Sequence, residues 1–227
     1  MRFSIIMPVL NEEAALTEQL KHLHRLCAHI DCELLIVDGG SNDRTIGIAR
    51  RYGRVLCAER GRARQMNAGA AHASGEILLF LHADTQLPTR AFAAIERALD
   101  EPGVVGGAFR LRFDCASLPY RLVALSTNLR SHLSGTFTGD QAYFMRASSF
   151  HKAGGYPDQP LMEDLEIIHN LRKLGKLTLL AEYVTTSARR HAHLGLLRSV
   201  PFMWYLRLRY RLGTPPARLQ QLYTDVR

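Results

Sequence analysis

The chain has 227 residues, of which 47% are hydrophobic and 22% are charged, which is typical of a globular protein with one sizeable core. The formal net charge of +8 favours anionic partners such as nucleotides, nucleic acid or acidic lipid surfaces, without choosing among them. The 4 cysteines form no CxxC pair and show no zinc-ligand spacing, so we expect reduced thiols.

The N-terminal residues 1–8 form an apolar run of strand length, without the cleavage site of a signal peptide. No segment approaches the ~18 uncharged apolar residues that a membrane-spanning helix needs. The sequence therefore predicts a cytoplasmic protein that has no spanning helix.

Short apolar runs alternate with helical patterns through the first half of the chain. The apolar runs predict strands at residues 3–9, 32–37, 54–58 and 76–81. The helical patterns predict helices at residues 14–29, 41–51, 61–73 and 89–99, with Ser41 or Asn42 as the cap of the second and Thr89 as the cap of the fourth. This alternation predicts an α/β fold with a mostly parallel central sheet and helices on both faces.

The second half of the chain leads into a basic tail. Further strands are predicted at residues 103–113, 141–146 and 176–182, and further helices at residues 118–134 and 161–174. From residue 189 arginine alternates with leucine and aromatic residues. We therefore expect one domain at residues 1–188 and an amphipathic helical appendage at residues 189–227, which could dock on the core, lie on an anionic membrane surface or pair with another subunit. No RNA-recognition module is visible, so no nucleic acid partner is expected.

Two of the apolar runs end abruptly in an aspartate, at Asp38 and Asp84. In open α/β sheets the ligand lies outside the carboxyl ends of the strands, where a carboxylate suits a divalent cation on a phosphate. The turn after the first strand, residues 8–13, lacks the GxGxxG pattern of dinucleotide-binding enzymes. The sequence therefore predicts a nucleotide site in which a metal neutralises the phosphates.

Four motifs follow one another along the chain, at residues 4–13, 36–45, 61–69 and 79–85. Together they resemble the family 2 glycosyltransferases of the GT-A fold, and within that family the small bacterial branch with a Leu-His-Ala-Asp-Thr strand end. The resemblance covers nearly the whole chain. It implies transfer of a sugar from a UDP- or GDP-linked donor to an acceptor hydroxyl that the sequence does not identify, with inversion expected and retention left open.

The resemblance also implies residues that bind the nucleotide. Pro8, Leu10 and Glu12 would line the base and ribose pocket. Asp38 would reach the nucleobase, and Arg64 would approach the diphosphate. This part of the site comes from the first three motifs.

The strand end His82-Ala83-Asp84 matches the DxD motif of the family. Asp84 would hold Mn2+ or Mg2+ on the diphosphate, with Ala83 beside it. His82 stands where the first aspartate usually stands, and imidazole suits Mn2+ better than Mg2+, which leaves the identity of the metal open.

The pair Glu163-Asp164 opens a predicted helix and resembles the motif that supplies the catalytic base in inverting members. Asp164 is the expected base and Glu163 its neighbour, although acids are also stabilised at a helix start by the dipole alone. Arg190, with Arg189 beside it, fits part of a Gln-x-x-Arg-Trp pattern and could stabilise the leaving diphosphate.

Three further residues leave alternatives open. Asp140 either contacts the sugar or acceptor, or caps a turn. His191 or His193 could add a third metal ligand or be structural.

Two other functions remain as alternatives. A sugar-1-phosphate nucleotidyltransferase would want a glycine-rich loop after the first strand, which residues 8–13 do not supply. A non-catalytic relative that binds a nucleotide or a membrane is suggested by His82 in place of an aspartate.

Overall fold

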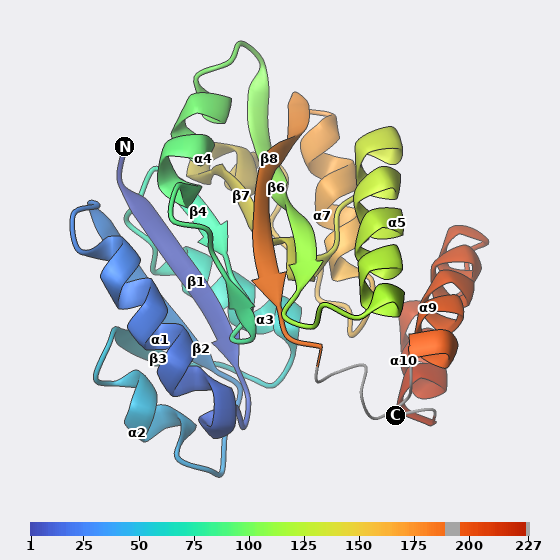
Figure 1. The fold of residues 1–227 in the computed structure, drawn as a ribbon, viewed down its shortest axis with the longest axis horizontal. Coiled ribbons are helices and arrows are strands. Elements are labelled where there is room, and N and C mark those ends of the chain that lie inside the picture. The colour runs from blue at the N-terminus through green and yellow to red at the C-terminus, as the bar shows by residue number, and fades with distance from the viewer. Residues whose placement is uncertain (189–195, 226–227) are drawn as a thin grey trace.

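The structure is a computed structural model that describes residues 1–188 and 196–225, and its core is a central sheet covered by helices (Figure 1). The strands are β1 Phe3–Val9, β2 Cys32–Asp38, β3 Arg54–Cys57, β4 Ile77–Phe80, β5 Thr85–Gln86, β6 Val104–Phe113, β7 Tyr143–Arg146 and β8 Lys176–Thr186. The helices are α1 Glu13–Cys27, α2 Thr45–Ala49, α3 Arg62–Ala71, α4 Ala91–Leu99, α5 Leu118–Ser134, α6 Ala147–Lys152, α7 Glu163–Arg172, α9 Leu196–Arg211 and α10 Pro216–Asp225, with a short 3-10 helix η1 at Gly139–Gln141.

The strand order is β3-β2-β1-β4-β7-β6-β8-β5. The first four strands of this order are parallel, as the alternation of strands and helices predicts. Strand β7 lies antiparallel between β4 and β6, β8 is parallel to β6, and β5 is antiparallel to β8. The α/β fold with a mostly parallel sheet is confirmed, and β7 and β5 make its second half mixed.

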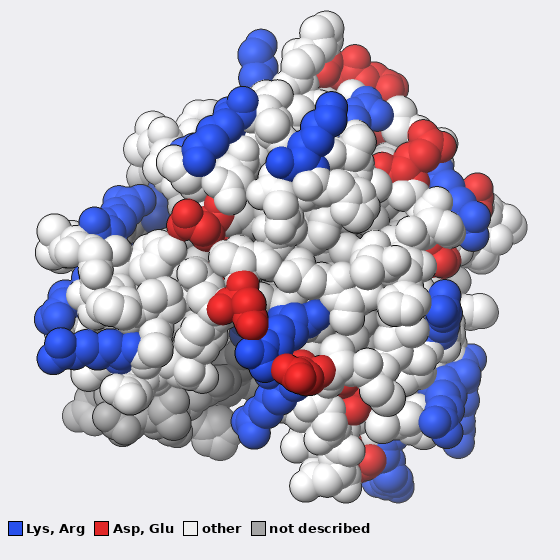
Figure 2. Space-filling view, turned by 180° about the vertical axis from the view of Figure 1, so that it is seen from behind, with Lys and Arg blue, Asp and Glu red and all other residues white. Residues whose placement is uncertain are grey.

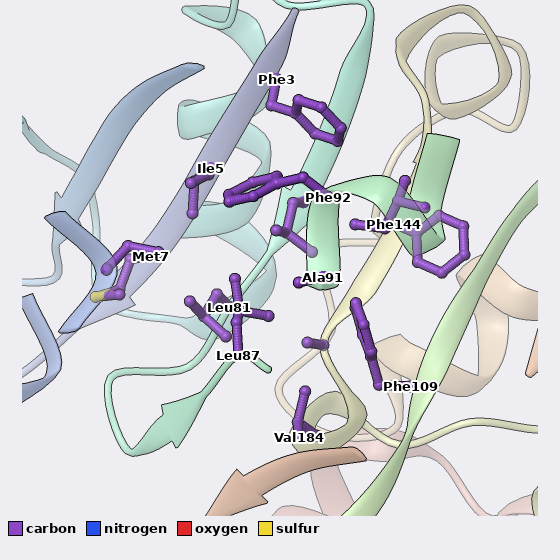
Figure 3. Packing of buried hydrophobic residues seen from close by; sticks show 14 of the residues in the cluster. Phe3, Ile5, Met7, Leu81, Leu87, Ala91, Phe92, Phe109, Phe144 and Val184 are labelled. Atoms are coloured by element: carbon purple, nitrogen blue, oxygen red, sulfur yellow. The ribbon is translucent and has the colours of Figure 1, made fainter. Parts of the chain in front are cut away.

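Strand β1 is buried on both faces, which explains why its sequence is almost wholly apolar. Phe3, Ile5 and Met7 point into one hydrophobic cluster, whereas Ile6 points into a second cluster on the opposite face of the sheet. In the first cluster the rings of Phe3 and Phe92 meet edge to face, with centroids 4.9 Å apart (Figure 3). The core is therefore two layers of side chains, one on each face of the sheet.

The helices divide between these two layers. Side chains of α1 and α4 fill the first cluster, and side chains of α3, α6 and α7 fill the second. Helix α5 lies against β6, where the amide of Asn128 accepts from the backbone N–H of Leu111 at 2.8 Å and donates to its carbonyl at 2.9 Å. The layers hold the strand ends rigidly, and the strand ends form the candidate site.

Several predicted boundaries need correction. Helix α2 begins at Thr45 rather than near Ser41, because Ser41 is part of a turn that bonds to Asp38. Its N-cap is Arg44, and that of α4 is Arg90 rather than Thr89. Strand β8 runs on beyond the predicted residue 182 because its last residues pair with both β6 and β5.

The described part of the tail forms two helices, α9 and α10, as expected for a helical appendage. They pack through Leu206 and Leu219 against Met162, in a small cluster separate from both faces of the sheet. None of the helices in the described ranges combines the length and the apolar character that crossing a membrane requires. Lys and Arg side chains are spread among Asp and Glu over the face shown in Figure 2 rather than gathered in one patch.

Candidate functional site

The carboxyl ends of β1 and β2 are held together by one glutamine from α3. The Nε2 of Gln65 donates to the carbonyls of Val9 and Val37, each at 2.8 Å, and the side chain is buried. A Cβ on Gly39 would lie 3.0 Å from the Gln65 amide, so only glycine fits there without movement of the amide. Gln65 therefore fixes the relative position of two predicted nucleotide-binding strand ends.

Asp38 ends β2 and organises the turn that follows it. Its Oδ2 accepts from the backbone N–H groups of Gly40 at 2.8 Å and Ser41 at 2.9 Å, and its Oδ1 accepts from the Ser41 hydroxyl. The carboxylate is buried, yet one of its roughly four acceptor positions remains for another donor. The structure thus gives Asp38 a structural task, and its contact with a nucleobase stays a prediction.

The loop after β1 is tied to the loop after β2. The backbone N–H of Asn11 donates to Ser41 Oγ at 2.9 Å, and that of Glu12 donates to Thr45 Oγ1 at 2.8 Å. Asn11 adopts a φ of 54°, which lets its side chain accept from Asn42. The half-buried Pro8, Leu10 and Glu12, predicted to line the base pocket, lie on or just after this strand end.

Asp84 follows β4 and is half-buried, and its Oδ1 accepts from the hydroxyl of Thr85 at 3.4 Å. Its backbone carbonyl accepts from the N–H of Ser187 at 3.0 Å, just beyond the end of β8. Thr85 and Thr186 are paired in β5 and β8, and their hydroxyls lie 3.1 Å apart. The end of β8 therefore fixes the peptide that carries Asp84.

His82 is buried, and its ring contacts η1. Its Nδ1 lies 3.0 Å from Oδ1 of Asp140, and a Cβ on Gly139 would lie 2.7 Å from its Cε1. The ring nitrogens of His82 thus face Asp140 and the backbone of Gly139. Its contacts support a role in orienting Asp140, and its role as a metal ligand stays a prediction.

The start of α7 carries a buried carboxylate, Glu163, whose pKa is raised. Glu163 is 4% exposed, and its Oε1 lies 3.5 Å from Nη1 of Arg62. Burial raises the pKa of Glu163 to about 7, in opposition to the charge of Arg62 and with the help of Asp164. Burial lowers the pKa of Arg62, but the negative charges of Glu163, Asp140 and Asp164 outweigh it, so that the pKa is raised. A connected set of charges thus runs from the η1 turn to the start of α7.

Arg64, predicted to approach a diphosphate, makes two ion pairs at the surface. Its Nε and Nη2 bind Asp158 at 2.7 and 3.0 Å, and its Nη1 binds Glu59 at 2.6 Å. The guanidinium that reaches Glu163 belongs instead to Arg62, one of three arginines in the same sequence run. The diphosphate contact of Arg64 stays a prediction.

Asp84 is a candidate ligand for a divalent cation. Within residues 1–188 and 196–225 no group of three or more histidine, cysteine or acidic side chains has the arrangement of a metal site. The half-buried Asp84 offers the oxygen ligand that Mg2+ and Mn2+ accept, and such ions commonly complete their shell with phosphate oxygens and water. Asp84 therefore fits a cation shared with a phosphate. Four residues with predicted roles lie outside the described part of the chain: Arg189, Arg190, His191 and His193.

A cavity of about 220 Å³ lies between α7 and α9. Its lining includes Glu166, Tyr210 and Arg211, and none of the predicted site residues. The Tyr210 hydroxyl donates to Glu166 at 2.9 Å across one side of it. We assign no function to this cavity.

Five residues of the region escaped prediction from sequence, because nothing in their local pattern separates them from core or surface residues. Gln65 and Arg62 lie on α3, and Tyr143 and Tyr156 bury their rings beside the end of β4. Arg130 of α5 is the fifth, and its charge interacts with that of Asp164. Arg62 and Gln65 both belong to the motif at residues 61–69, whose pattern does not separate them from its other polar residues.

The chain was compared with known proteins. The model of the family described as Glycosyl transferase family 2 matches residues 4–151. The undecaprenyl-phosphate 4-deoxy-4-formamido-L-arabinose transferase of Pseudomonas aeruginosa is 33% identical over 137 residues, which are 54% of this chain and 40% of that protein. The chain spans about half the length of the curated relatives it matches, or less.

Two solved structures share the fold. The mannosyltransferase PcManGT from Pyrobaculum calidifontis, in complex with GDP-Man and Mn2+, has a TM-score of 0.67 and 20% identity over 95% of this chain and 66% of its own. Glucosyl-3-phosphoglycerate synthase from Mycobacterium tuberculosis, in complex with Mn2+, UDP and glucosyl-3-phosphoglycerate, has a TM-score of 0.59 and 19% identity over 82% of this chain and 70% of its own.

Proposed function

Because the chain belongs to glycosyl transferase family 2, we propose that it transfers a sugar from a nucleotide diphosphate-sugar to a hydroxyl group of an acceptor. The family match covers the strands and loops that would bind the donor. The observation that carries the proposal is a link between the acidic residues near the end of β4 and those at the start of α7. Asp140 contacts His82 near the end of β4, and its charge acts on Arg62, which in turn contacts Glu163.

The proposed donor is UDP- or GDP-linked. It is supported by the bound GDP-Man of the mannosyltransferase and the bound UDP of the synthase, which share this fold. In this chain Pro8, Leu10 and Glu12 would line the base and ribose, and Asp38 would use its remaining acceptor position on the base. Arg64 would attract the diphosphate from the edge of the site.

Asp84 would hold the divalent cation, Mn2+ or Mg2+, with Ala83 beside it. When bound there, the cation supplies positive charge that stabilises the departing diphosphate. Both solved structures named above contain Mn2+, which supports the use of a divalent metal. His82 is the weaker candidate ligand, because its ring faces Asp140 and Gly139.

The proposed reaction is a direct displacement at the anomeric carbon. The acceptor oxygen forms a bond to this carbon while the bond between this carbon and the diphosphate oxygen breaks. The nucleoside diphosphate leaves with the electron pair. The acceptor proton passes to Asp164, which is half-buried at the start of α7, with Glu163 beside it. A single displacement inverts the configuration. Arg190 would add positive charge near the leaving group.

The remaining parts of the proposal concern organisation. Residues 1–188 would form the transferase domain and residues 189–227 an appendage, consistent with the separate cluster of Leu206, Leu219 and Met162. The protein would act in the cytoplasm, with α9 able to contact the inner face of the membrane. Its basic and aromatic side chains support such contact.

The test measures release of nucleoside diphosphate from a panel of UDP- and GDP-sugars with Mn2+ or Mg2+. We expect slow hydrolysis of one donor by the unaltered protein and its loss in Asp84→Asn, with Asp100→Asn on the surface as the matched control. Absence of both hydrolysis and donor binding by the unaltered protein would overturn the proposal. Pyrophosphate release from a sugar-1-phosphate and a nucleoside triphosphate would instead identify a nucleotidyltransferase. Binding of the donor without turnover would identify a non-catalytic relative.

A further inference from the structure

Four buried polar atoms in the described part of the chain have no hydrogen-bond partner: Arg130 Nη2, Tyr143 OH, Tyr156 OH and Arg207 Nε. Native interiors pair nearly all such atoms, so each exception calls for an explanation. Both tyrosines are only 2% exposed, so their hydroxyls do not simply face solvent. A shared ligand would explain all four atoms together if they lie in one place.

The two tyrosines lie beside the strand end that carries Asp84. Tyr143 is the register partner of Phe80, the last residue of β4, and the rings of Phe80 and Tyr156 meet edge to face at 5.1 Å. Asp84 follows Phe80 by one short turn. Both tyrosines therefore lie near the end of β4, the strand that leads to Asp84.

The two arginines come from the neighbouring helices α5 and α9, which contact each other. The Nη1 of Arg130 donates to the carbonyl of Thr136 at 2.8 Å, whereas its Nη2 has no hydrogen-bond partner. Leu206, next to Arg207, packs on Met162, which immediately precedes Glu163. Arg207 is therefore held close to the start of α7.

The charge of Asp164 acts on Tyr143, Tyr156 and Arg130, and the charge of Arg207 acts on Tyr143 and Arg130. After burial, the charge of Asp164 is the next largest influence on the pKa of Tyr143, and it also raises the pKa of Tyr156. Burial and then the nearby charge of Arg207 lower the pKa of Arg130 to about 10, while Asp164 acts in the opposite direction. Two guanidiniums thus repel each other beside the carboxylate of the proposed base.

We propose that Arg130, Arg207 and the hydroxyls of Tyr143 and Tyr156 bind a phosphate group of the acceptor and so present its hydroxyl to Asp164. The inference rests on the proposed function and adds the class of acceptor. A guanidinium pairs with two phosphate oxygens at once, and phosphate has enough oxygens to accept from both arginines and both hydroxyls. The negative charge of a phosphate would also offset the mutual repulsion of the two guanidiniums.

Phenyl phosphate serves as the soluble probe, titrated into the protein saturated with Mn2+ and the nucleoside diphosphate that it binds best. We expect binding that is at least about tenfold weaker in Arg130→Met and in Arg207→Met, because each loses a charge-assisted hydrogen bond. Arg130→Lys should retain part of the affinity, which separates loss of charge from loss of fold. Arg121→Met on the exposed side of α5 and Arg218→Met on α10 are the matched controls.

The phosphate could belong to a soluble molecule or to a lipid. Flotation with phosphatidylcholine vesicles that contain phosphatidic acid tests the lipid source, with phosphatidylglycerol at equal charge as the control. Preference for phosphatidic acid that is lost in Arg130→Met and kept in Arg218→Met supports a lipid phosphate, and binding of phenyl phosphate alone supports a soluble one.

Two results would overturn the inference. One is equal binding of phenyl phosphate and benzyl alcohol together with no preference for phosphatidic acid. The other is a loss of affinity for the nucleoside diphosphate in the two Met variants, since the arginines would then serve the donor. Failure of the unaltered protein to bind any nucleotide would count against the proposed function instead, because phosphate binding can be measured without a nucleotide.

A second, independent observation concerns the outer face of α5. Five of its leucines are 55–75% exposed and recur at the spacing of one helical face: Leu118, Leu122, Leu125, Leu129 and Leu133. The adjacent α9 exposes Trp204 at 48%, Leu208 at 56% and Tyr205 at 44%. Neither helix contains an acidic residue, and both contain arginines. Apolar side chains among cations and without anions complement an anionic lipid surface.

We infer that the outer faces of α5 and α9 lie together on an anionic bilayer surface. Binding to phosphatidylcholine vesicles that contain phosphatidylglycerol should fall at least about tenfold in the double variant Leu122→Gln/Leu129→Gln, which loses two exposed leucines that the bilayer would bury. Leu174→Gln, on an exposed leucine elsewhere, is the control. Equal vesicle binding by the double variant would overturn the inference, as would a concentration-dependent dimer that the double variant abolishes, because the stripe would then bind a second copy.

Discussion

The Nη1 of Arg62 lies 3.5 Å from Oε1 of Glu163, so that the first residue of α3 and the first residue of α7 meet across the proposed site. The carboxylate is almost fully buried, whereas the guanidinium side chain is 45% exposed. This unequal burial explains why the cation only partly offsets the cost of ionising Glu163.

Glu163 should make stability depend on pH. The unfolded carboxyl loses its proton near 4.5 and the folded one near 7, so the folded state binds more protons in this window and stability falls as pH rises through it. Glu163→Gln removes the group and should flatten the fall. Melting temperatures across the window test this, and an equally steep fall in the variant would show that another group is responsible.

Asp164→Asn should reduce sugar transfer by about a hundred- to ten-thousand-fold, because it removes the proposed proton acceptor. Binding of the nucleotide-sugar, followed by calorimetry, should stay nearly unchanged. Loss of donor binding in this variant would speak against Asp164 as the base and in favour of a role in the nucleotide pocket.

Asp84→Ala should abolish the part of the nucleotide-induced rise in melting temperature that depends on the metal. A ligand that binds only the folded state stabilises it, so a panel of nucleotides with Mn2+, Mg2+ or chelator separates the two contributions. A rise in the variant that still depends on Mn2+ would show that other groups hold the cation.

Gln65→Leu should destabilise the fold by about 1–3 kcal/mol, because two strand-end carbonyls lose a buried donor. Val9 still accepts from the N–H of Gly39, which limits the loss at that strand end. Urea unfolding measures the loss, with Gln221→Leu on the surface of α10 as the control. A variant as stable as the control would mean that these carbonyls find other donors.

Gly139→Ala should push the His82 ring away from its present position, since the new Cβ would lie 2.7 Å from Cε1. We expect weaker transfer together with a changed preference between Mn2+ and Mg2+ if His82 or Asp140 acts at the site. Gly47→Ala, which meets nothing within 4 Å, is the matched control. Unchanged transfer and unchanged metal preference would remove both residues from the mechanism.

The sequence predicts much of the fold because apolar runs of strand length and helical periods are local signals. Asp84 could be singled out for the same reason, since a charge ends an apolar run. The position of β7 between β4 and β6 could not, because strand order depends on contacts between distant segments. The local role of Asp38 was readable in part, as an aspartate before two glycines and a serine favours a turn that bonds to its own side chain.

The residues that sequence analysis missed share one property. Arg130 stands in a helix, where a solvated side chain is the ordinary outcome for an arginine. Tyr143 stands in an apolar strand and reads as core. The influence of Asp164 on both residues arises only when α5, β7 and α7 assemble.

The bond from Ser187 to the carbonyl of Asp84, together with the pairing of Thr85 and Thr186, has a consequence for synthesis of the protein. On the ribosome the parallel strands β1 to β4 emerge early and can already pair with one another. The peptide that carries Asp84 waits for β8, so a nascent or truncated chain that ends before Thr186 would have an ordered amino-terminal half and an unfinished reaction centre.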